Sequence, residues 1–408
     1  MLSAQTISII KSTVPVLEVH GQAITTRFYD MLFQNHPELL HIFNHVNQRQ
    51  GRQQAALANA VYAAAQHIDQ LENIMPVVKQ IAHKHRSLGV LPEHYPIVGS
   101  HLLLAIKEVL GDACTDEILQ AWTEAYGIIA DAFIAVEEQM YVEAEQQSGG
   151  FRHFKPFTVI NKVVESSVIT SFYLQPLDGS SIPPFTAGQY ISIKAAIPGE
   201  QYEQIRQYSV SNISGEPYLR ISVKREDGGN YPAGKVSNYL HQQVQIGDVL
   251  PISAPAGDFV LQSNNKPLVL ISGGVGQTPL YSMLSTALAE QVKRPITYVH
   301  AAINKEAHAF VEQLKQLQTE HNQLQAYVCY EQPTENDTLH VDYNKAGYID
   351  LPWLRSIIPT DADFYICGPL PFMKAVYHML TELGIDAKQI NYEMFGPALD
   401  ISTPALSV

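Results

Sequence analysis

The sequence predicts three successive domains of different fold class: an all-α domain, an antiparallel β-barrel, and an α/β domain with a doubly wound parallel sheet. At 408 residues, the chain is too long for one ordinary hydrophobic core. Its first third shows apolar residues at three- and four-residue spacings. Short β-branched runs follow, and then apolar strands alternate with helical stretches. We place the domains at residues 1–147, 151–262 and 266–408.

The composition is that of a soluble globular protein, because 46% of the residues are hydrophobic and 16% are charged. The net charge of −14 argues against a nucleic-acid binder, which needs a basic surface to meet phosphates. No apolar run is long enough to span a membrane, and the first residues lack the features of a signal peptide. The three cysteines are too widely spaced for a disulfide framework or a CxxC site. We therefore expect a cytoplasmic protein with no integral membrane segment.

The first domain reads as helices separated by prolines, at Pro37, Pro76 and Pro92. Its longest helical pattern is DEILQAWTEAYGIIADAFIAVEEQMYVEAE, which starts at Asp116. The segment QQSGG, which ends at Gly150, is rich in small and polar residues and makes a natural boundary.

Two histidines of this domain lie one residue apart in IAHKHRSLGVLPEHY, so a helix points them to nearly opposite sides. Val78, Ile81 and Leu88 form an apolar stripe, and His85 falls on that stripe whereas His83 does not. One interpretation is a buried histidine that bonds to a backbone carbonyl. The other is a metal or haem ligand. The spacing alone leaves both open.

The second and third domains differ in how their strands are separated. In the second, short runs rich in β-branched and aromatic residues are divided by Gly, Pro and Ser, which predicts an antiparallel barrel. These runs are FTVINKVVESSVITSFYLQP, AGQYISIKA, RQYSVSNIS and YLRISVKR. In the third, strands alternate with helical stretches, which predicts a parallel, doubly wound sheet. Its strands are PLVLIS, ITYVHAA, LQAYVCY and DFYICG.

A glycine-rich turn opens the third domain, in PLVLISGGVGQTPLYSMLS. Gly273, Gly274 and Gly276 leave backbone N–H groups free to face a pyrophosphate. Thr278 is expected to cap the following helix, and Pro279 suits its first turn. The turn does not match GxGxxG, so a tight structural turn and a phosphate cradle are both compatible with it.

Other motifs surround this turn. RQYSV offers a cation, an aromatic ring and a hydroxyl at Arg206, Tyr208 and Ser209, and GKVSNYL begins a helix at Gly234. CGPLPFM closes a strand, and YEMFGP places Phe395 near the C-terminus. Taken singly, each has a plain structural interpretation: Tyr208 as a half-buried strand residue, Gly234 as a turn and Phe395 as core.

Together and in this order, the motifs RxYS, GxVS, GGxGxTP, CGP and a terminal aromatic resemble the ferredoxin–NADP reductase superfamily. The resemblance covers the chain after about residue 151. It implies FAD on the barrel and NADH or NADPH on the α/β domain. The implied FAD residues are Tyr190, Arg206, Gln207, Tyr208 and Ser209, with Gly234, Lys235, Val236 and Ser237 at its pyrophosphate. The implied NAD(P)H residues are Gly273, Gly274, Val275, Gly276, Gln277, Thr278 and Pro279, with Cys367, Gly368 and Pro369 near the nicotinamide. Met394, Phe395, Gly396 and Pro397 complete the set of cofactor residues.

The helical domain resembles a bacterial globin in FYDMLFQNHPELLHIFN, GRQQAALANAVYAAAQHI and HKHRSLGVLPEHYPIVG. The whole chain thus resembles the flavohaemoglobins, a family of nitric oxide dioxygenases. This resemblance makes His85 the axial ligand of haem b and leaves His83 at the surface. It also puts Lys84 near a haem propionate or the flavin domain, although a lysine there is ordinarily just solvated.

Four residues match the family's distal side, where O₂ binds: Tyr29, Phe43, Gln53 and Leu57. The resemblance implies that the Tyr29 phenol donates a hydrogen bond to O₂ and that Phe43 packs against the porphyrin. Gln53 and Leu57 are four residues apart and so share a helix face. Without the resemblance, Gln53 fits the solvent edge of that face and Phe43 fits the core.

Glu137 lies on the same apolar helical stripe as Ala130 and Tyr141, where an unpaired carboxylate is costly. If it faces inward, its natural partners are Tyr95 and His85. The alternative is a bent helix that lets the carboxylate reach solvent. The family pairs a carboxylate and a tyrosine with the haem histidine, and such a bond gives the imidazole more imidazolate character.

The resemblance implies that the chain converts nitric oxide and O₂ to nitrate, with electrons passing from NAD(P)H to FAD and then to haem. Glu393 matches a position between flavin and haem, although a strand-end acid with no electron-transfer role fits equally. Two rival functions are a sensor or store for O₂ or NO, and a general flavin reductase with an accessory globin.

Besides O₂ and NO, we expect a lipid or azole to fit the distal pocket, and we expect a monomer. VHAAINKEAHAF leaves the choice of NADH or NADPH open, because it offers neither the acid expected for a 2′-hydroxyl nor an arginine for a 2′-phosphate. The ending over residues 398–408 is longer than is usual for the family.

Overall fold

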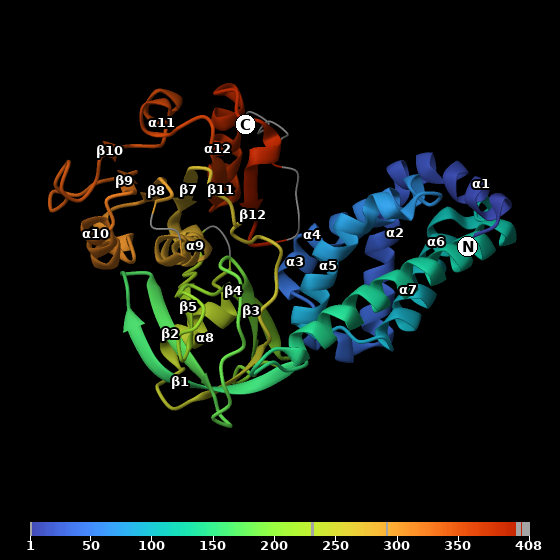
Figure 1. Ribbon diagram of the computed structural model, residues 1–408. Helices are drawn as coiled ribbons and strands as arrows, with labels where there is room; N and C mark the ends of the chain where they lie inside the picture. Colours follow the sequence, from blue (N-terminus) through green and yellow to red (C-terminus); the bar gives the residue numbers. More distant parts are fainter. Residues whose placement is uncertain (1, 230–231, 291–292, 397–400, 402–408) are drawn as a thin grey trace.

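The computed structural model describes residues 2–229, 232–290, 293–396 and 401. Its order is helical domain, barrel and α/β domain, which confirms the predicted fold class. Figure 1 shows the helices as a lobe beside the two sheet domains, with the α/β domain over one end of the barrel. Within the described residues, every helix is too short or too polar to cross a membrane.

The helical domain packs its helices around a core that includes Phe28, Leu32 and Trp122. Its α-helices are α1 (Ala4–Ser12), α2 (Val14–Asn35), α3 (His45–Arg49), α4 (Arg52–Gln66), α5 (Met75–Leu88), α6 (His94–Leu110) and α7 (Asp116–Gln146). Short 3-10 turns are η1 (Pro37–His41), η2 (Leu71–Ile74) and η3 (Gly111–Ala113). Thr115 caps α7 by accepting the Ile118 N–H, and α5 ends at Gly89, whose φ of +76° suits glycine. Because α5 packs against α7, the predicted histidine and carboxylate face each other.

The barrel follows as six antiparallel strands in the order β4-β3-β6-β1-β2-β5. They are β1 (Phe154–Val164), β2 (Ile169–Pro176), β3 (Tyr190–Ala195), β4 (Gln204–Ser209), β5 (Leu219–Lys224) and β6 (Val249–Ser253), with α8 (Lys235–Gln242) after β5. A bridge between Val210 and Ile221 joins the two ends of this order and closes the barrel. Its interior is aliphatic and aromatic, with Phe157, Phe172 and Ile191 fully buried.

The third domain is a parallel sheet in the order β10-β9-β8-β7-β11-β12. Its strands are β7 (Leu268–Gly273), β8 (Ile296–Ala302), β9 (Leu324–Tyr330), β10 (Lys345–Ala346), β11 (Asp363–Cys367) and β12 (Ile390–Glu393). Its helices are η4 (Gly274–Gly276), α9 (Gln277–Glu290), η5 (Lys305–Ala307), α10 (Val311–Glu320), α11 (Leu351–Ile357), α12 (Leu370–Glu382) and η6 (Ala387–Gln389). The order reverses between β7 and β11, which is where such sheets bind nucleotides.

Candidate functional site

A histidine, a carboxylate and a phenol meet inside the helical domain. His85 of α5 bonds through Nδ1 to Glu137 Oε1 of α7 at 2.7 Å, and Tyr95 of α6 donates to the same oxygen at 2.6 Å. The Tyr95 hydroxyl also lies 3.2 Å from His85 Nδ1. Glu137 is 3% exposed, so it faces inward as its place on the stripe predicts. A buried carboxylate is thereby satisfied by two partners.

The surroundings of this network determine which of its groups carry a proton. Burial, and then the charge of Glu137, raises the pKa of Tyr95, so the phenol stays protonated and donates to the carboxylate. Tyr126 fixes the position of Tyr95 by donating to its carbonyl at 2.6 Å. With its Nδ1 proton directed at Glu137, His85 presents Nε2 as a basic nitrogen, and no residue in the described part of the chain bonds to it. A neutral imidazole supported in this way is a donor that suits haem iron.

An aromatic cluster in the same domain joins α2 to the segment between η1 and α3. Tyr29 is buried, and its ring centroid lies 5.7 Å from those of Phe33 and Phe43. Burial raises the pKa of Tyr29, and the nearby Gln53 and Gln48 side chains oppose this shift. Leu57 is half-buried and packs against the same core. The four predicted distal residues thus come together, and Gln53 faces the phenol rather than solvent.

His83 is not a surface residue, which corrects the prediction. Its Nδ1 accepts the Gly257 N–H of the barrel at 3.3 Å, and burial lowers the pKa of the imidazole. Its neighbour Lys84 donates to the Gly396 carbonyl at 3.4 Å, and burial lowers its pKa while Glu393 opposes the shift. The side of α5 that faces away from the helical core therefore lies against the other two domains.

The predicted flavin residues lie on β3 and β4, which pair with each other. Tyr190 pairs with Ser209, and Gln207 of β4 lies opposite Ser192. Arg206 has no ion pair among the described residues; it donates to the Ile205 carbonyl at 2.7 Å, and desolvation lowers its pKa. Ser209 Oγ is buried without a hydrogen-bond partner. An unpaired guanidinium, an unpartnered hydroxyl and the half-buried Tyr208 ring on one strand fit a phosphate-bearing aromatic cofactor.

The helix start predicted at Gly234 is α8, which turns its first backbone N–H groups toward any bound anion. Val236 and Ser237 are buried, and Ser237 Oγ donates to the Gly234 carbonyl at 3.1 Å. A Cβ at position 234 would lie 2.9 Å from Glu226, so glycine is needed there. Lys235 forms an ion pair with Glu200 at 2.6 Å, which makes it less available to a phosphate.

The glycine-rich turn and the CGP motif touch each other at the end of the parallel sheet. A Cβ on Gly276 would lie 2.2 Å from the Cys367 carbonyl oxygen, so only glycine allows this approach. Gln277 is buried and its Nε2 has no hydrogen-bond partner. Thr278 does not cap the helix as predicted, because α9 begins before it and its hydroxyl donates to the Val275 carbonyl at 3.0 Å.

The remaining predicted residues lie near this junction. Pro279 is in the first turn of α9, and Gly368 and Pro369 lead from β11 into α12. Glu393 pairs with Cys367 across β12 and β11; burial raises the pKa of Cys367, and burial also raises the pKa of Glu393 to about 8. Met394 packs against the core of the α/β domain, whereas Phe395 is 53% exposed and so is not core. Pro397 and most of the 398–408 ending lie outside the described residues, but Ile401 is buried.

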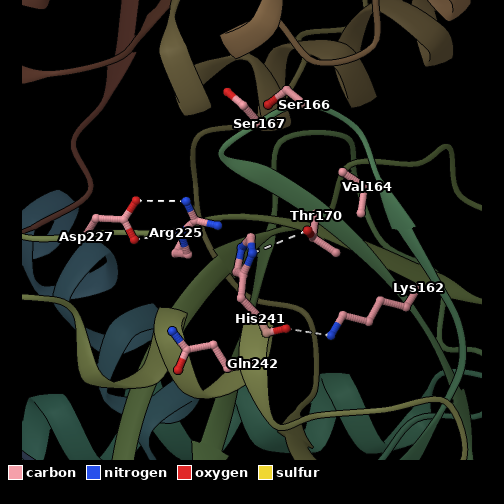
Figure 2. Close-up of a pocket in the computed structure, with 9 residues that line it drawn as sticks. All are labelled: Lys162, Val164, Ser166, Ser167, Thr170, Arg225, Asp227, His241 and Gln242. Carbon is pink, nitrogen blue, oxygen red and sulfur yellow. Dashed lines mark hydrogen bonds and ion pairs between the residues drawn. The ribbon is translucent and has the colours of Figure 1, made fainter.

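A hollow of about 550 Å³ lies elsewhere, on the outside of the barrel (Figure 2). Its polar groups are engaged with one another: Lys162 donates to the His241 and Val244 carbonyls at 2.8 Å, and Arg225 pairs with Asp227. His241 Nε2 bonds to the Val223 carbonyl at 2.7 Å. Because these groups are already satisfied, we assign no ligand to this hollow.

Two residues that contact the predicted site residues were not predicted from the sequence. Tyr126, which holds Tyr95, lies four residues before Ala130 on the Glu137 stripe, so extending that stripe backwards would have found it. Gln48, beside the Tyr29 phenol, lies in a short connecting helix where no periodicity points to it.

A helical domain with a carboxylate-supported histidine, joined to a flavin-type barrel and a nucleotide-type parallel sheet, defines a haem domain coupled to its own reductase. Family models agree: Globin matches residues 26–133, Oxidoreductase FAD-binding domain residues 156–261, and Oxidoreductase NAD-binding domain residues 270–378. The flavohemoprotein of Bacillus thuringiensis subsp. konkukian is 57% identical over 403 residues, covering 98% of this chain and 100% of that protein. That of Bacillus subtilis is 54% identical, covering 98% and 99%.

Solved structures agree as well. A flavohemoglobin from Malassezia yamatoensis, with bound FAD and heme, aligns with a TM-score of 0.84 at 31% identity, covering 97% of this chain and all of that one. The FAD/NAD-binding domain of nitric oxide dioxygenase from Vibrio cholerae aligns with a TM-score of 0.55 at 41% identity, covering 60% of this chain and 100% of that one. The chain belongs to the flavohaemoglobin family, also called flavohemoproteins, and is an oxidoreductase with a globin, an FAD-binding and an NAD-binding domain.

Proposed function

We propose that this protein is a nitric oxide dioxygenase that converts NO and O₂ to nitrate at the expense of NAD(P)H. The observation that carries the proposal is the His85–Glu137–Tyr95 network, which supports a strongly donating imidazole inside a globin joined to a reductase. The Vibrio cholerae relative of the reductase part is named a nitric oxide dioxygenase. When bound, NAD(P)H supplies two electrons as a hydride, FAD divides them into single electrons, and haem b supplies an iron that binds O₂.

His85 Nε2 would hold the haem iron. Glu137 accepts the Nδ1 proton at 2.7 Å, which adds imidazolate character to the ring and makes it a better electron donor. Tyr95 donates to the same carboxylate oxygen, so it limits how far the proton moves from His85 toward Glu137. This arrangement favours activation of O₂ over reversible storage.

Tyr29 and Gln53 would act where O₂ is held. The buried phenol is protonated, so it would donate a hydrogen bond to O₂ and stabilise the negative charge that develops there. Gln53 orients the phenol. Phe43 and Leu57 line this region with apolar surface and exclude water.

In the reductase part, Arg206 and Ser209 would bind FAD phosphate and hydroxyl groups, with Tyr190 and Tyr208 against its rings. The Gly273–Pro279 turn would bind the NAD(P)H pyrophosphate, and the contact between Gly276 and Cys367 would place the nicotinamide end at the CGP turn. Lys84 is next to His85 in the chain and interacts with Glu393, which pairs with Cys367. The charge of Lys84 and the protonation state of Glu393 would therefore influence the flavin potential.

We further propose that the chain works as a monomer in the cytoplasm, and that the distal pocket accepts a lipid or an azole as well as the gases. The free state of all three cysteines fits a reducing compartment. The apolar lining by Phe43 and Leu57 suits such a ligand.

The test is an absorption spectrum of the purified protein, followed by anaerobic NADH and then by O₂ with NO. We expect haem and flavin bands, reduction of both by NADH, and stoichiometric nitrate. Haem that is reduced and binds O₂ without forming nitrate would point to a sensor or store. Absence of haem would overturn the role of His85.

A further inference from the structure

The connection between β3 and β4 reaches out of the barrel and touches the helical domain. Tyr202 on this connection contacts two histidines, with its ring centroid 5.3 Å from that of His41 and 5.9 Å from that of His45. Both imidazoles meet the phenol ring nearly at right angles, at 82° and 80°. Two edge-to-face contacts together restrain the position of an aromatic ring.

Hydrogen bonds from the two residues after Tyr202 fix the same histidines. The Glu203 N–H donates to His41 Nδ1 at 3.1 Å, and Gln204 Nε2 lies 3.4 Å from His45 Nδ1. His45 Nε2 in turn bonds to the Leu40 carbonyl at 2.7 Å. The Glu203 carboxylate lies 3.7 Å from His41 and 3.9 Å from Lys194. We call Tyr202 with His41 and His45 the tyrosine clamp.

The tyrosine clamp contacts the segment at residues 41–45, which includes Phe43, a residue of the proposed distal pocket. His41 ends η1 and His45 begins α3, so Phe43 lies midway between the two gripped residues. The Phe43 ring contacts the Tyr29 ring edge-on, with centroids 5.7 Å apart. A shift of the clamped segment would therefore move a residue in contact with the proposed O₂-binding phenol.

The connection that carries Tyr202 leads directly into the strand of the proposed flavin site. β4 begins at Gln204, and the same strand carries Arg206, Tyr208 and Ser209. The barrel also contacts α5 of the helical domain, because Gly257 donates to His83 and the Pro255 carbonyl accepts from Arg86, both residues of α5. The barrel thus contacts the helical domain beside Phe43 and beside His85.

We propose that Tyr202 is a positioning residue for the electron transfer from flavin to haem. Tyr202 fixes the flavin barrel to the 41–45 segment of the helical domain, and it thereby also holds Phe43 in place. The inference rests on the proposed function, because it presumes haem at His85 and FAD at Arg206. Tyr202 touches no reacting atom, so its removal leaves hydride transfer from NADH to the flavin unchanged.

The test is anaerobic stopped-flow reduction of the full-length holoprotein by NADH, which separates flavin reduction from haem reduction. In Tyr202→Ala, we expect haem reduction to slow at least about tenfold while flavin reduction stays within about twofold of the parent, as displacement of a remote support predicts. Tyr202→Phe keeps both ring contacts and restores the parent rate. Tyr348→Ala is the matched control, because Tyr348 is 74% exposed on the α/β domain.

A second readout reports on the distal wall without turnover. Moving Phe43 shifts the C–O stretching frequency of the carbon monoxide adduct in Tyr202→Ala and in His45→Ala, and leaves it unchanged in Tyr202→Phe. Unchanged haem reduction in Tyr202→Ala, or equal slowing in the Ala and Phe variants, would overturn the inference. Failure of the parent protein to form nitrate would instead overturn the proposed function, and the two rates would still report on the clamp.

Discussion

The proposed haem-ligand network and the proposed nucleotide sites satisfy their buried polar groups in opposite ways. In the helical domain, the Glu137 carboxylate, the Tyr95 phenol and His85 Nδ1 bond to one another. In the reductase part, Ser209 Oγ and Gln277 Nε2 are buried without partners, and Arg206 has no ion pair in the described part of the chain. A pocket that tunes a permanently held group carries its own support, whereas surfaces that bind nucleotides leave donors for the ligand to satisfy.

The largest expected effect is loss of haem when its proposed ligand is removed. In His85→Ala, we expect no haem band after purification while the flavin band persists, because the two pockets are built from different domains. The haem-to-flavin absorbance ratio measures this. His83→Ala is the control on the same helix, since His83 bonds to the barrel instead. A haem-loaded His85→Ala protein would show that the ligand lies elsewhere.

Removal of the unpaired guanidinium is expected to weaken FAD binding. A hydrogen bond to a charged group contributes about 1.5–3 kcal/mol, so Arg206→Ala would raise the FAD dissociation constant roughly 10- to 100-fold. Fluorescence titration of the apoprotein with FAD measures it. Arg225→Ala, in which an arginine already paired with Asp227 is lost, serves as the control. Equal affinity in both variants would place the FAD phosphates away from β4.

Loss of the carboxylate's charge is expected to act on the iron without releasing the haem. Glu137→Gln keeps the size of the side chain but removes the anion that polarises His85, so we expect nitrate formation to fall about 10- to 100-fold. The haem reduction potential should rise, because the ligand donates less electron density. Glu138→Gln, next along α7 but exposed and paired with Arg152, should leave the potential unchanged. A lowered potential in Glu137→Gln would contradict this role.

Proton binding at Glu393 predicts a pH dependence of stability. Burial raises its pKa in the folded protein to about 8, above the ordinary value near 4.5, so the folded state holds the proton where the unfolded state has lost it. This contribution to the free energy of unfolding is full below about pH 4.5 and is lost as the pH rises through about 8.

Compared with Glu393→Gln, the parent protein should therefore lose about 1–2 kcal/mol more stability between pH 5 and pH 8, after allowance for partial exposure and for Lys84. Urea unfolding across this range, followed by flavin fluorescence, measures the difference. Parallel pH curves for the two proteins would mean that Glu393 is ionised at neutral pH.

The sequence predicted the inside of each domain better than the contacts between domains. The helical stripe placed Glu137 inward, since 3.6-residue periodicity reports which face meets a domain's own core. The same reasoning failed for His83, because the face that points away from that core lies against the barrel. Thr278 was misplaced because element boundaries depend on backbone contacts that spacing does not encode. The clamp of Tyr202 by His41 joins positions far apart in the chain, and no local pattern relates them.

The smallest predicted effect concerns the choice between NADH and NADPH. In doubly wound sheets the nucleotide ribose reaches the end of the second strand, which here is β8, and a cation there favours a 2′-phosphate. Lys305 lies three residues after β8, but its Nζ pairs with the buried Asp342 at 2.8 Å. Asp342 also accepts the Thr338 N–H, which fixes the carboxylate in place. The pair neutralises Lys305, the first cation in the chain after this strand, so we expect a preference for NADH.

Asp342→Asn should release Lys305 and raise the ratio of kcat/KM for NADPH to that for NADH about two- to fivefold, the range expected for one partly exposed ion pair. Asp350→Asn breaks a similar pair with Lys345 on the far edge of the same sheet and should leave the ratio unchanged. Flavin reduction by each nucleotide gives the ratio without O₂ or NO. An equal response to both nucleotides would show that the β8 end does not contact the ribose, and that selectivity is set on β9 or on the barrel instead.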